Sequence, residues 1–549
     1  MDAITTPPAP VNEPNLSYAP GTAERAELAA ELAAQVGTVR QLDAHIGGER
    51  VAGRGEEIQV VQPHAHQQVV GVLRNSTADD TRAAIAAARE AAPGWRGLSY
   101  DDRAAILLRA AELLAGPWRQ RLNAATVLGQ SKSPFQAEID AACELIDFWR
   151  FNVHFGRQIL AEQPIRNAPG VWNRTDHRPL EGFVYAITPF NFTAIAGNLP
   201  TAPALMGNTV LWKPSPTQQL AASLTMELLE EAGMPPGVIN MLPGDGLAVS
   251  EVALADPGLA GIHFTGSTPT FQHLWRTVGE NLSSYRSYPR LVGETGGKDF
   301  VIAHPSADPA VLRTALIRGA FEYAGQKCSA ASRAYVPRSL WARMGDDLIA
   351  ETDALPIGDP TDFANFTGAV IDGRAFAKHK AAIERASSTA GLHVVAGGTV
   401  DDSVGWFVRP TIVVAEDPAD EMFRTEYFGP ILALHVYDDT RPGAFEEIVR
   451  QAESMAPYAL TGAVLATDRR AIDWASEELR FAAGNFYVND KPTGAVVGQQ
   501  PFGGARASGT NDKAGSMLNL LRWTSARSIK ETLVPPIDHR YPHMDVPGS

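Results

Sequence analysis

A carboxylate and a thiol stand in two short segments where they could carry covalent catalysis. Glu294 belongs to Gly-Glu-Thr-Gly-Gly-Lys, and Cys328 belongs to Gly-Gln-Lys-Cys-Ser. The interval between them predicts a strand at 300–303 and a helix at 310–323, so folding can return both side chains to one cleft. A free thiol has a pKa of about 8.5, and Lys327 or a helix N-terminus beside Cys328 would favour the nucleophilic thiolate. A lone cysteine is more often an inert core residue, so the pair by itself remains a hypothesis.

Alternating strand and helix patterns surround this pair and predict the elements that position it. Ahead of Glu294, strands separated by helical stretches indicate a parallel sheet with helices on its faces. The alternation resumes near Lys298 and predicts a second lobe. Parallel sheets bind ligands at the carboxyl ends of their strands, so functional residues are expected there. The predicted strands are 183–188, 209–213, 238–242 and 261–264 in the first lobe, and 300–303, 334–336, 411–414, 431–437 and 461–466 in the second.

The N-terminal region predicts a Pro-rich extended arm over residues 1–22, followed by helices and two short strands. The predicted helices are 22–36, 78–92, 100–114 and 136–155, and the predicted strands are 58–61 and 69–72.

Composition and charge bound the function class. The chain has 549 residues, enough for two large lobes, and its net charge of −15 argues against a nucleic-acid surface, where Lys and Arg must neutralise phosphates. Its two cysteines, Cys143 and Cys328, allow no disulfide framework and fit a reducing, cytoplasmic compartment. Cys143 lies in a helical context where burial is expected. We find neither a secretory signal nor about 18 consecutive apolar residues, so no membrane partner is expected.

Three strand ends carry polar or small residues. Asn191 follows the first predicted strand, Lys213 ends the second, and Gly266-Ser267 follows the fourth. A lysine at a strand end suits a nucleotide ribose, and the helix N–H groups after Gly266 suit a diphosphate. The Gly-Ser turn lacks the later glycines of G-x-G-x-x-G, and an ordinary N-cap explains Ser267 equally well. From these residues alone, nucleotide binding and plain turn chemistry both stay open.

The joint pattern resembles the aldehyde dehydrogenase superfamily, whose active sites pair a Glu-x-Gly-Gly-Lys loop with a Gly-Gln-x-Cys segment. The resemblance implies that Cys328 is the nucleophile and that Glu294 activates the hydrolytic water. It implies that Asn191, in Pro-x-Asn-Phe, and the Cys328 N–H hold the oxyanion. The implied fold is α/β and aldehyde dehydrogenase-like, with a Rossmann-type cofactor domain, an α/β catalytic domain and a small β oligomerisation element.

The same resemblance implies a dinucleotide cofactor. Lys-Pro-Ser and the later Gly-Ser turn match the superfamily's cofactor segments, and Glu-Tyr-Phe-Gly-Pro matches the segment that holds the nicotinamide ribose. Pro216 stands where many members carry a residue that helps to choose between NAD and NADP, and NAD is our first choice. The implied cofactor contacts are Lys213, Ser215, Gly266, Ser267, Glu426 and Phe428.

Essentially the whole chain, and residues 489–515 above all, looks like the L-glutamate γ-semialdehyde dehydrogenases, also called 1-pyrroline-5-carboxylate dehydrogenases. This implies NAD-dependent oxidation of L-glutamate γ-semialdehyde to L-glutamate, the second step of proline degradation. The Gly-rich segment offers successive N–H groups for the substrate's anionic end. Ala495 stands where that family can carry a serine. The implied substrate contacts are Phe192, Ser329, Gly494, Ala495 and Phe502.

Three alternatives remain from the sequence. The chain could oxidise another semialdehyde or an aliphatic aldehyde, pass its thioester to coenzyme A, or be a non-catalytic relative. Glu294 favours hydrolysis over transfer to coenzyme A. The joint presence of Cys328, Glu294 and Asn191 argues against a non-catalytic role.

By the same resemblance we expect at least a homodimer. A polar hairpin near 171–180 and a C-terminal strand near 524–531 would offer edges to a second subunit. The expected division of the chain is an N-terminal arm and helix over 1–50, a dinucleotide-binding domain over 51–170 and 183–297, a catalytic domain over 298–500, and an oligomerisation element over 171–182 and 524–549.

Overall fold

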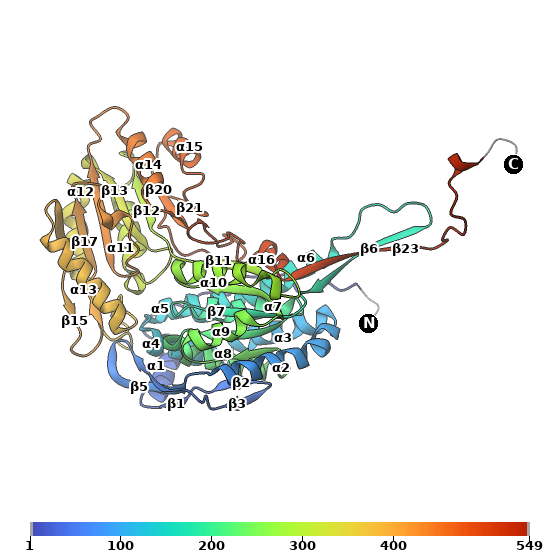
Figure 1. Ribbon diagram of the computed structural model, residues 1–549. Helices are drawn as coiled ribbons and strands as arrows, with labels where there is room; N and C mark the ends of the chain where they lie inside the picture. The colour runs from blue at the N-terminus through green and yellow to red at the C-terminus, as the bar shows by residue number, and fades with distance from the viewer. Residues whose placement is uncertain (1–3, 546–549) are drawn as a thin grey trace.

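The computed structural model describes residues 4–545, which build two lobes around two seven-stranded sheets. Figure 1 shows the first lobe in the lower half of the view and the second lobe at the upper left. The expected α/β class is confirmed. Residues 1–3 and 546–549, which fall in the expected arm and oligomerisation element, lie outside the described residues.

The first sheet has the strand order β11-β10-β7-β8-β9-β2-β3. Its first five strands run parallel, while β2 and β3 extend it antiparallel at one edge. The strands are β2 Ala44–Ile46, β3 Glu49–Val51, β7 Phe183–Thr188, β8 Thr209–Pro214, β9 Ile239–Met241, β10 Leu259–Thr265 and β11 Arg290–Glu294. The four strands predicted here from apolar runs are confirmed, with ends that differ by at most two residues.

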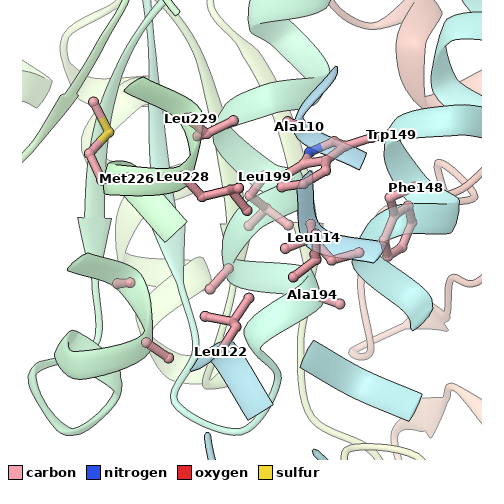
Figure 2. Packing of buried hydrophobic residues seen from close by; sticks show 14 of the residues in the cluster. Ala110, Leu114, Leu122, Phe148, Trp149, Ala194, Leu199, Met226, Leu228 and Leu229 are labelled. Atoms are coloured by element: carbon pink, nitrogen blue, oxygen red, sulfur yellow. The ribbon is translucent and has the colours of Figure 1, made fainter. Parts of the chain in front are cut away.

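Both faces of this sheet are buried, which explains why its strands read as continuous apolar runs. Val184 and Trp212 pack into one core layer, whereas Tyr185 and Leu211 pack into the layer on the other face. Figure 2 shows the first layer, where Leu114, Trp149 and Leu199 from three different helices meet. The helices of this lobe are α1 Ala23–Gln35, α2 Ala78–Gly97, α3 Tyr100–Ala115, α4 Arg119–Gln130, α5 Pro134–Ala137, α6 Leu145–Ala161, α7 Thr193–Leu205, α8 Gln219–Glu231, α9 Gly246–Ala255 and α10 Thr268–Glu280.

The second sheet has the order β14-β17-β18-β13-β12-β20-β21, and all its pairings are parallel except that of β14 with β17. Two apolar layers cover its faces. Its strands are β12 Asp299–Ala303, β13 Ala331–Pro337, β14 Leu392–Ala396, β17 Thr411–Ala415, β18 Ile431–Tyr437, β20 Thr461–Leu465 and β21 Asn485–Val488, and its helices are α11 Pro309–Phe321, α12 Arg338–Ala354, α13 Gly373–Ser388, α14 Ala444–Met455 and α15 Arg469–Glu478. The five strands predicted for the second lobe are confirmed.

Smaller elements complete the chain. A three-stranded sheet of β1 Arg40–Gln41, β5 Ala65–Arg74 and β4 Glu57–Gln62 lies next to the first lobe, and α16 Met517–Leu521 precedes the last strand. Two short pairs are β15 Val400–Asp401 with β16 Phe407–Val408, and β19 Tyr458–Ala459 with β22 Ala505–Arg506. No helix within residues 4–545 is long and apolar enough to cross a membrane.

The helix predicted over 136–155 is interrupted. A π-helical turn, Glu138–Glu144, separates α5 from α6. Inside this turn the Asp140 carboxylate accepts hydrogen bonds from the N–H groups of Thr193 and Ala194, which begin α7. Helical periodicity does not distinguish such a turn from regular helix, so the prediction was wrong here.

The hairpin predicted near 171–180 is also wrong. Val171–Pro179 forms one strand, β6, which pairs antiparallel with β23, Thr524–Thr532, over its whole length. Figure 1 shows this two-stranded ribbon projecting from the body of the protein. A polar strand requires a partner to satisfy its backbone, and here the partner comes from the other end of the chain.

Candidate active site

Cys328 lies in a strained loop between α11 and β13. Tyr323, Ala324 and Gly325 all adopt left-handed backbone conformations, with φ of 51°, 50° and 64°. A Cβ on Gly325 would lie 2.3 Å from the carbonyl oxygen of Gly429, so only glycine fits that position. Non-glycine residues rarely hold this conformation unless their surroundings fix it, and such strain gathers at functional sites. This strained turn, which comes just before Cys328, fixes the course of the backbone that carries its side chain.

Cys328 lines two hollows. One is a cavity of about 320 Å³, and the other is a smaller hollow lined also by Glu426 and Phe428. Cys328 is therefore a wall residue both of a small-molecule cavity and of the region where cofactor contacts are predicted.

Burial raises the pKa of the Cys328 thiol, and the negative charges of Asp299, Glu426 and Glu294 raise it further. Lys327 does not counter this effect, since its ammonium pairs with Glu322 at 3.1 Å. Cys328 also lies in a loop and not at a helix N-terminus. The expectation that Lys327 or a helix favours the thiolate was wrong, because the surroundings of Cys328 raise the pKa of its thiol.

Glu294 ends β11, and its carboxylate rests in the Gly-rich C-terminal segment. Its Oε2 accepts a hydrogen bond from the N–H of Gly504 at 3.0 Å. Cβ atoms on Gly503 and Gly509 would lie 3.0 and 3.2 Å from its two oxygens, so glycines leave the space it fills. Burial raises the pKa of Glu294 well above that of an ordinary glutamate, while Lys513 acts in the opposite direction. A buried carboxyl of this kind accepts a proton at higher pH than an exposed one does.

Asn191 follows β7 and is buried against the cysteine loop. Its Nδ2 donates to the carbonyl oxygen of Gln326 at 3.0 Å, which leaves its second N–H free to donate. Within residues 4–545, no protein acceptor takes the N–H of Cys328. The structure therefore brings an amide group and a free backbone N–H to the same loop.

All five predicted substrate contacts line the cavity that Cys328 shares: Phe192, Ser329, Gly494, Ala495 and Phe502. The Ser329 hydroxyl lies 2.7 Å from that of Thr493, which begins the segment 493–500, here called the anchor loop. Gly494 has a φ of 96°. In the described part of the chain, the N–H groups of Gly494 and Ala495 have no hydrogen-bond acceptor. Two successive free N–H groups make an anion-binding concavity.

The cavity also contains acidic residues that sequence reasoning missed. Glu144 and Asp147, at the end of the π turn and in α6, both line it. Burial raises the pKa of Glu144 to about 8, and the nearby Asp140 contributes to the rise. The carboxylate of Glu144 has no hydrogen-bond donor among the described residues. Its position inside the run Ala-Ala-Cys-Glu-Leu-Ile was the available signal, because an acid amid apolar residues is seldom buried without a role.

Cys143 is buried, as expected. Its Sγ lies 3.5 Å from Glu138 Oε1, and burial raises the pKa of its thiol.

The predicted cofactor residues of the first lobe lie where strands end and helices begin. Lys213, in β8, is buried and donates to the carbonyl oxygens of Pro214 and Gly244 at 2.9 and 2.5 Å. Burial lowers its pKa to about 8. Helix α9 begins beside it, since a Cβ on Gly246 would lie 3.1 Å from Lys213 Cε.

The turn at Gly266 leads directly into α10. The Gly266 N–H donates to the Glu294 carbonyl oxygen at 3.2 Å, so this turn is tied to the catalytic candidate. Ser267 is the N-cap of α10, where its Oγ accepts from the N–H of Thr270 at 3.3 Å. The Ser215 hydroxyl lies 3.2 Å from that of Thr217. The capping role thus explains Ser267 by structure alone. The first turns of α9 and α10 offer backbone N–H groups at the carboxyl ends of the parallel strands that precede them.

Glu426 and Phe428 come from the second lobe. Glu426 Oε1 accepts from the N–H of Gly297 at 2.8 Å, and burial raises the pKa of this carboxyl. Phe428 has a φ of 60°, and its ring meets that of Phe190 edge to face at 5.8 Å between centroids. These residues supply a buried cation, two helix N-termini, a carboxylate and an aromatic ring, which are the kinds of group that dinucleotide sites use.

Residues 51–529 match the aldehyde dehydrogenase family. The chain is 46% identical over 544 residues to the mitochondrial delta-1-pyrroline-5-carboxylate dehydrogenase of Dictyostelium discoideum, with 99% of this chain and 97% of that protein covered. It is 47% identical over 534 residues to the human protein of the same name, with 97% and 94% covered. The crystal structure of the Delta-pyrroline-5-carboxylate dehydrogenase from Mycobacterium tuberculosis, bound with NAD, aligns with a TM-score of 0.95 at 64% identity over 100% of both chains. This chain belongs to the aldehyde dehydrogenase family.

Proposed function

We propose that this chain oxidises L-glutamate γ-semialdehyde to L-glutamate with NAD, as the second step of proline degradation. The observation that carries the proposal is one cavity whose lining holds the Cys328 thiol, the free N–H groups of Gly494 and Ala495, and the carboxylate of Glu144. A cavity of about 320 Å³ accommodates a small molecule. Its lining complements both charged groups of an α-amino acid and places a nucleophile in the same space.

Each charged group of the substrate has a partner. The Gly494 and Ala495 N–H groups and the Ser329 hydroxyl hold the α-carboxylate, because oriented donors bind carboxylate oxygens strongly. Glu144 takes the α-ammonium, which also lowers the raised pKa of this acid and keeps it ionised.

Aromatic rings flank the methylene groups between these ends. Phe192 and Phe502 line the cavity, and the buried Lys132 ammonium lies 4.2 Å from the centroid of the Phe192 ring. The contact fixes that ring by a cation–π interaction. An apolar wall on both sides excludes water from the aliphatic part of the substrate.

Catalysis begins when pyrroline-5-carboxylate opens in water to the semialdehyde. The Cys328 thiol gives its proton to solvent as the sulfur attacks the carbonyl carbon, and a C–S bond forms while the carbonyl electrons move to oxygen. Asn191 and the Cys328 N–H stabilise this oxyanion, and loss of such a donor typically costs about 2.7–4 kcal/mol. Bound NAD accepts a hydride from the same carbon, which leaves a glutamyl thioester on Cys328.

Glu294 completes the cycle. Because burial raises its pKa, its carboxylate is a stronger base than that of an exposed glutamate, and it takes a proton from water as the water oxygen attacks the thioester carbon. The C–S bond breaks, the sulfur takes the proton that Glu294 holds, and the new carboxylic acid loses its proton to solvent as L-glutamate leaves. The negative charge of Glu294 contributes to the raised pKa of Cys328, which supports a position in the same cleft.

The cofactor contacts follow from the same geometry. Lys213 would hold the adenine-side ribose, since its ammonium has three donors and two carbonyl partners here. Ser215 flanks it, and the helix that starts after Gly266 and Ser267 would meet the diphosphate. Glu426 would hold the nicotinamide ribose and Phe428 would pack near the ring. The relatives described above carry this activity in their names, and one was solved with NAD.

We also propose a homodimer at least, joined through the β6–β23 ribbon, where Trp172 is 50% exposed. Light scattering at micromolar concentration tests this, and a monomeric mass would contradict it. The proposed division of the chain is 1–50 for the N-terminal arm and helix, 51–170 and 183–297 for dinucleotide binding, 298–500 for catalysis, and 171–182 with 524–549 for assembly. Two free cysteines suit a reducing compartment such as the cytoplasm, although the two relatives compared carry mitochondrial in their names.

Steady-state kinetics tests the function. We expect NADH formation with pyrroline-5-carboxylate at a kcat/KM at least tenfold above that with succinate semialdehyde or propanal, and a preference for NAD over NADP. Equal specificity constants for the three aldehydes would refute the assignment of the substrate, and absence of NADH formation with all of them would refute the activity.

A further inference from the structure

The N-terminal arm forms part of the wall of the substrate cavity. Asn12, Glu13 and Asn15 line the same cavity as Cys328 and Glu144. Nothing in the Pro-rich composition of the arm indicated this position, and no step of the mechanism above uses these residues. Because a cavity wall decides which molecules fit, the arm is a candidate for substrate selection.

The Asn12 amide connects α6 to the anchor loop. Its Nδ2 donates to Asp147 Oδ2 at 2.7 Å and to the Val497 carbonyl oxygen at 2.8 Å. Its Oδ1 accepts from Gln499 Nε2 at 3.0 Å. The Glu13 N–H donates to the other oxygen of Asp147 at 2.7 Å. One side chain therefore ties two residues of the anchor loop to a carboxylate of α6 that also lines the cavity.

The arm itself is held firmly in place. The Glu13 carboxylate bridges Arg119 and Arg150, at 2.6 and 2.7 Å. Farther along, the Leu16 N–H donates to Glu138 at 2.9 Å, and the buried Tyr18 hydroxyl donates to the same carboxylate at 2.8 Å. Networks of charge-assisted bonds at low exposure hold a segment far better than surface pairs do. Asn12 is thus presented to the anchor loop from a fixed support.

We propose that Asn12 is a positioning and specificity-determining residue, which closes the cavity beside the anchor loop and holds that loop in the shape that binds the α-carboxylate. The inference rests on the proposed function and deepens it. The anchor loop carries the free N–H groups of Gly494 and Ala495, and Val497 and Gln499 lie two to five residues farther along the same loop. Without the Asn12 bonds to Val497 and Gln499, the Gly494 and Ala495 N–H groups are held less firmly. The loop that carries Cys328 keeps its hydrogen bond from Asn191.

The test compares two aldehydes with and without an amino-acid end. For Asn12→Ala, we expect the KM for glutamate semialdehyde to rise about tenfold, in line with the loss of charge-assisted hydrogen bonds, and kcat to stay within twofold. For propanal, which has no α-carboxylate for the anchor loop to bind, both constants are expected to stay within twofold. Asn12→Asp keeps the volume of the side chain but cannot donate to Asp147 or to the Val497 carbonyl, so we expect at least as large a rise in KM.

Ser17→Ala is the matched control on the same arm, since the Ser17 side chain is outside the cavity lining: its hydroxyl donates to Glu24 at 3.4 Å and accepts from the Ala19 N–H at 3.3 Å. Its constants are expected to equal those of the wild type. An unchanged KM for the semialdehyde in both Asn12 variants would overturn the proposal. So would an equal loss with propanal, because that result indicates general damage to the fold. A wild-type enzyme without preference for the semialdehyde would instead overturn the proposed function, and it would be seen before any variant is compared.

Discussion

The buried pair of Lys132 and Asp140 supports the start of α7, and its two members are expected to differ in importance. Asp140 accepts hydrogen bonds from Lys132 Nζ at 2.6 Å and from the N–H groups of Thr193 and Ala194 at 2.9 and 3.0 Å. Lys132 and Asp140 are each 1% exposed. The helix that they support begins directly after Asn191 and Phe192, so this pair fixes the residues predicted to bind the oxyanion and the substrate.

Asp140→Asn and Lys132→Met each remove one member of the pair, and they differ in how well the charge that remains buried is still stabilised. Asp140→Asn leaves the buried Lys132 ammonium without its hydrogen-bonded counter-charge, and breaking a buried pair in this way costs about 3–5 kcal/mol. Lys132→Met removes one partner of Asp140, but the carboxylate keeps two backbone donors and the favourable end of the α7 dipole, so we expect a cost of about 1–3 kcal/mol. Asp79→Asn serves as control, because Asp79 is 69% exposed and its surface pair with Arg82 contributes ~0–1 kcal/mol.

Thermal midpoints measured by differential scanning fluorimetry, together with kcat for the semialdehyde, check this order. A chain of this size need not unfold in two states, so the ranking of the midpoints is the readout. We expect Asp140→Asn to unfold at the lowest temperature and to lose the most kcat, Lys132→Met to be intermediate, and Asp79→Asn to match the wild type. A lower midpoint for Lys132→Met than for Asp140→Asn would refute the reasoning.

Three further outcomes are expected at the site. Cys328→Ala should abolish NADH formation while the affinity for NAD, measured by fluorescence titration, stays within twofold; retained turnover would place the nucleophile elsewhere. Glu294→Gln should accumulate a glutamyl thioester on Cys328, visible by intact mass after addition of substrate and NAD, and a normal steady-state rate without an adduct would contradict the role as base. Burial lowers the pKa of Lys213 to about 8, so its ammonium loses its proton as pH rises through that value, and kcat/KM for NAD should fall above about pH 8; a profile that matches that of Lys213→Ala would argue against the contact.

The sequence predicted the sheets well because their strands are buried on both faces. Strands such as Phe183–Thr188 and Ile431–Tyr437 are mostly apolar and mostly buried, so their residue types alone predict them. The predicted substrate contacts also lie together, because their motifs occupy loops at sheet edges. What the sequence did not reveal depends on distant partners. Asn12 donates to the Val497 carbonyl, and Lys327 pairs with Glu322, so that its charge does not favour the Cys328 thiolate. Both are side-chain contacts of the folded chain, and the periodicity of the sequence contains no information about them.

The pairing of β6 with β23 has a consequence for synthesis of the chain on the ribosome. Arg178 and Ser525, which pair across the ribbon, are 347 positions apart, so nearly the whole protein must be made before the earlier strand can find its partner. At about 5–20 residues per second, that strand waits roughly 17–70 s with its backbone groups unpaired. Nascent chains on one messenger would present the same bare edge to their neighbours during this interval. Charged and polar residues along that strand, among them Arg174, Asp176 and Arg178, are the kind that discourages premature association.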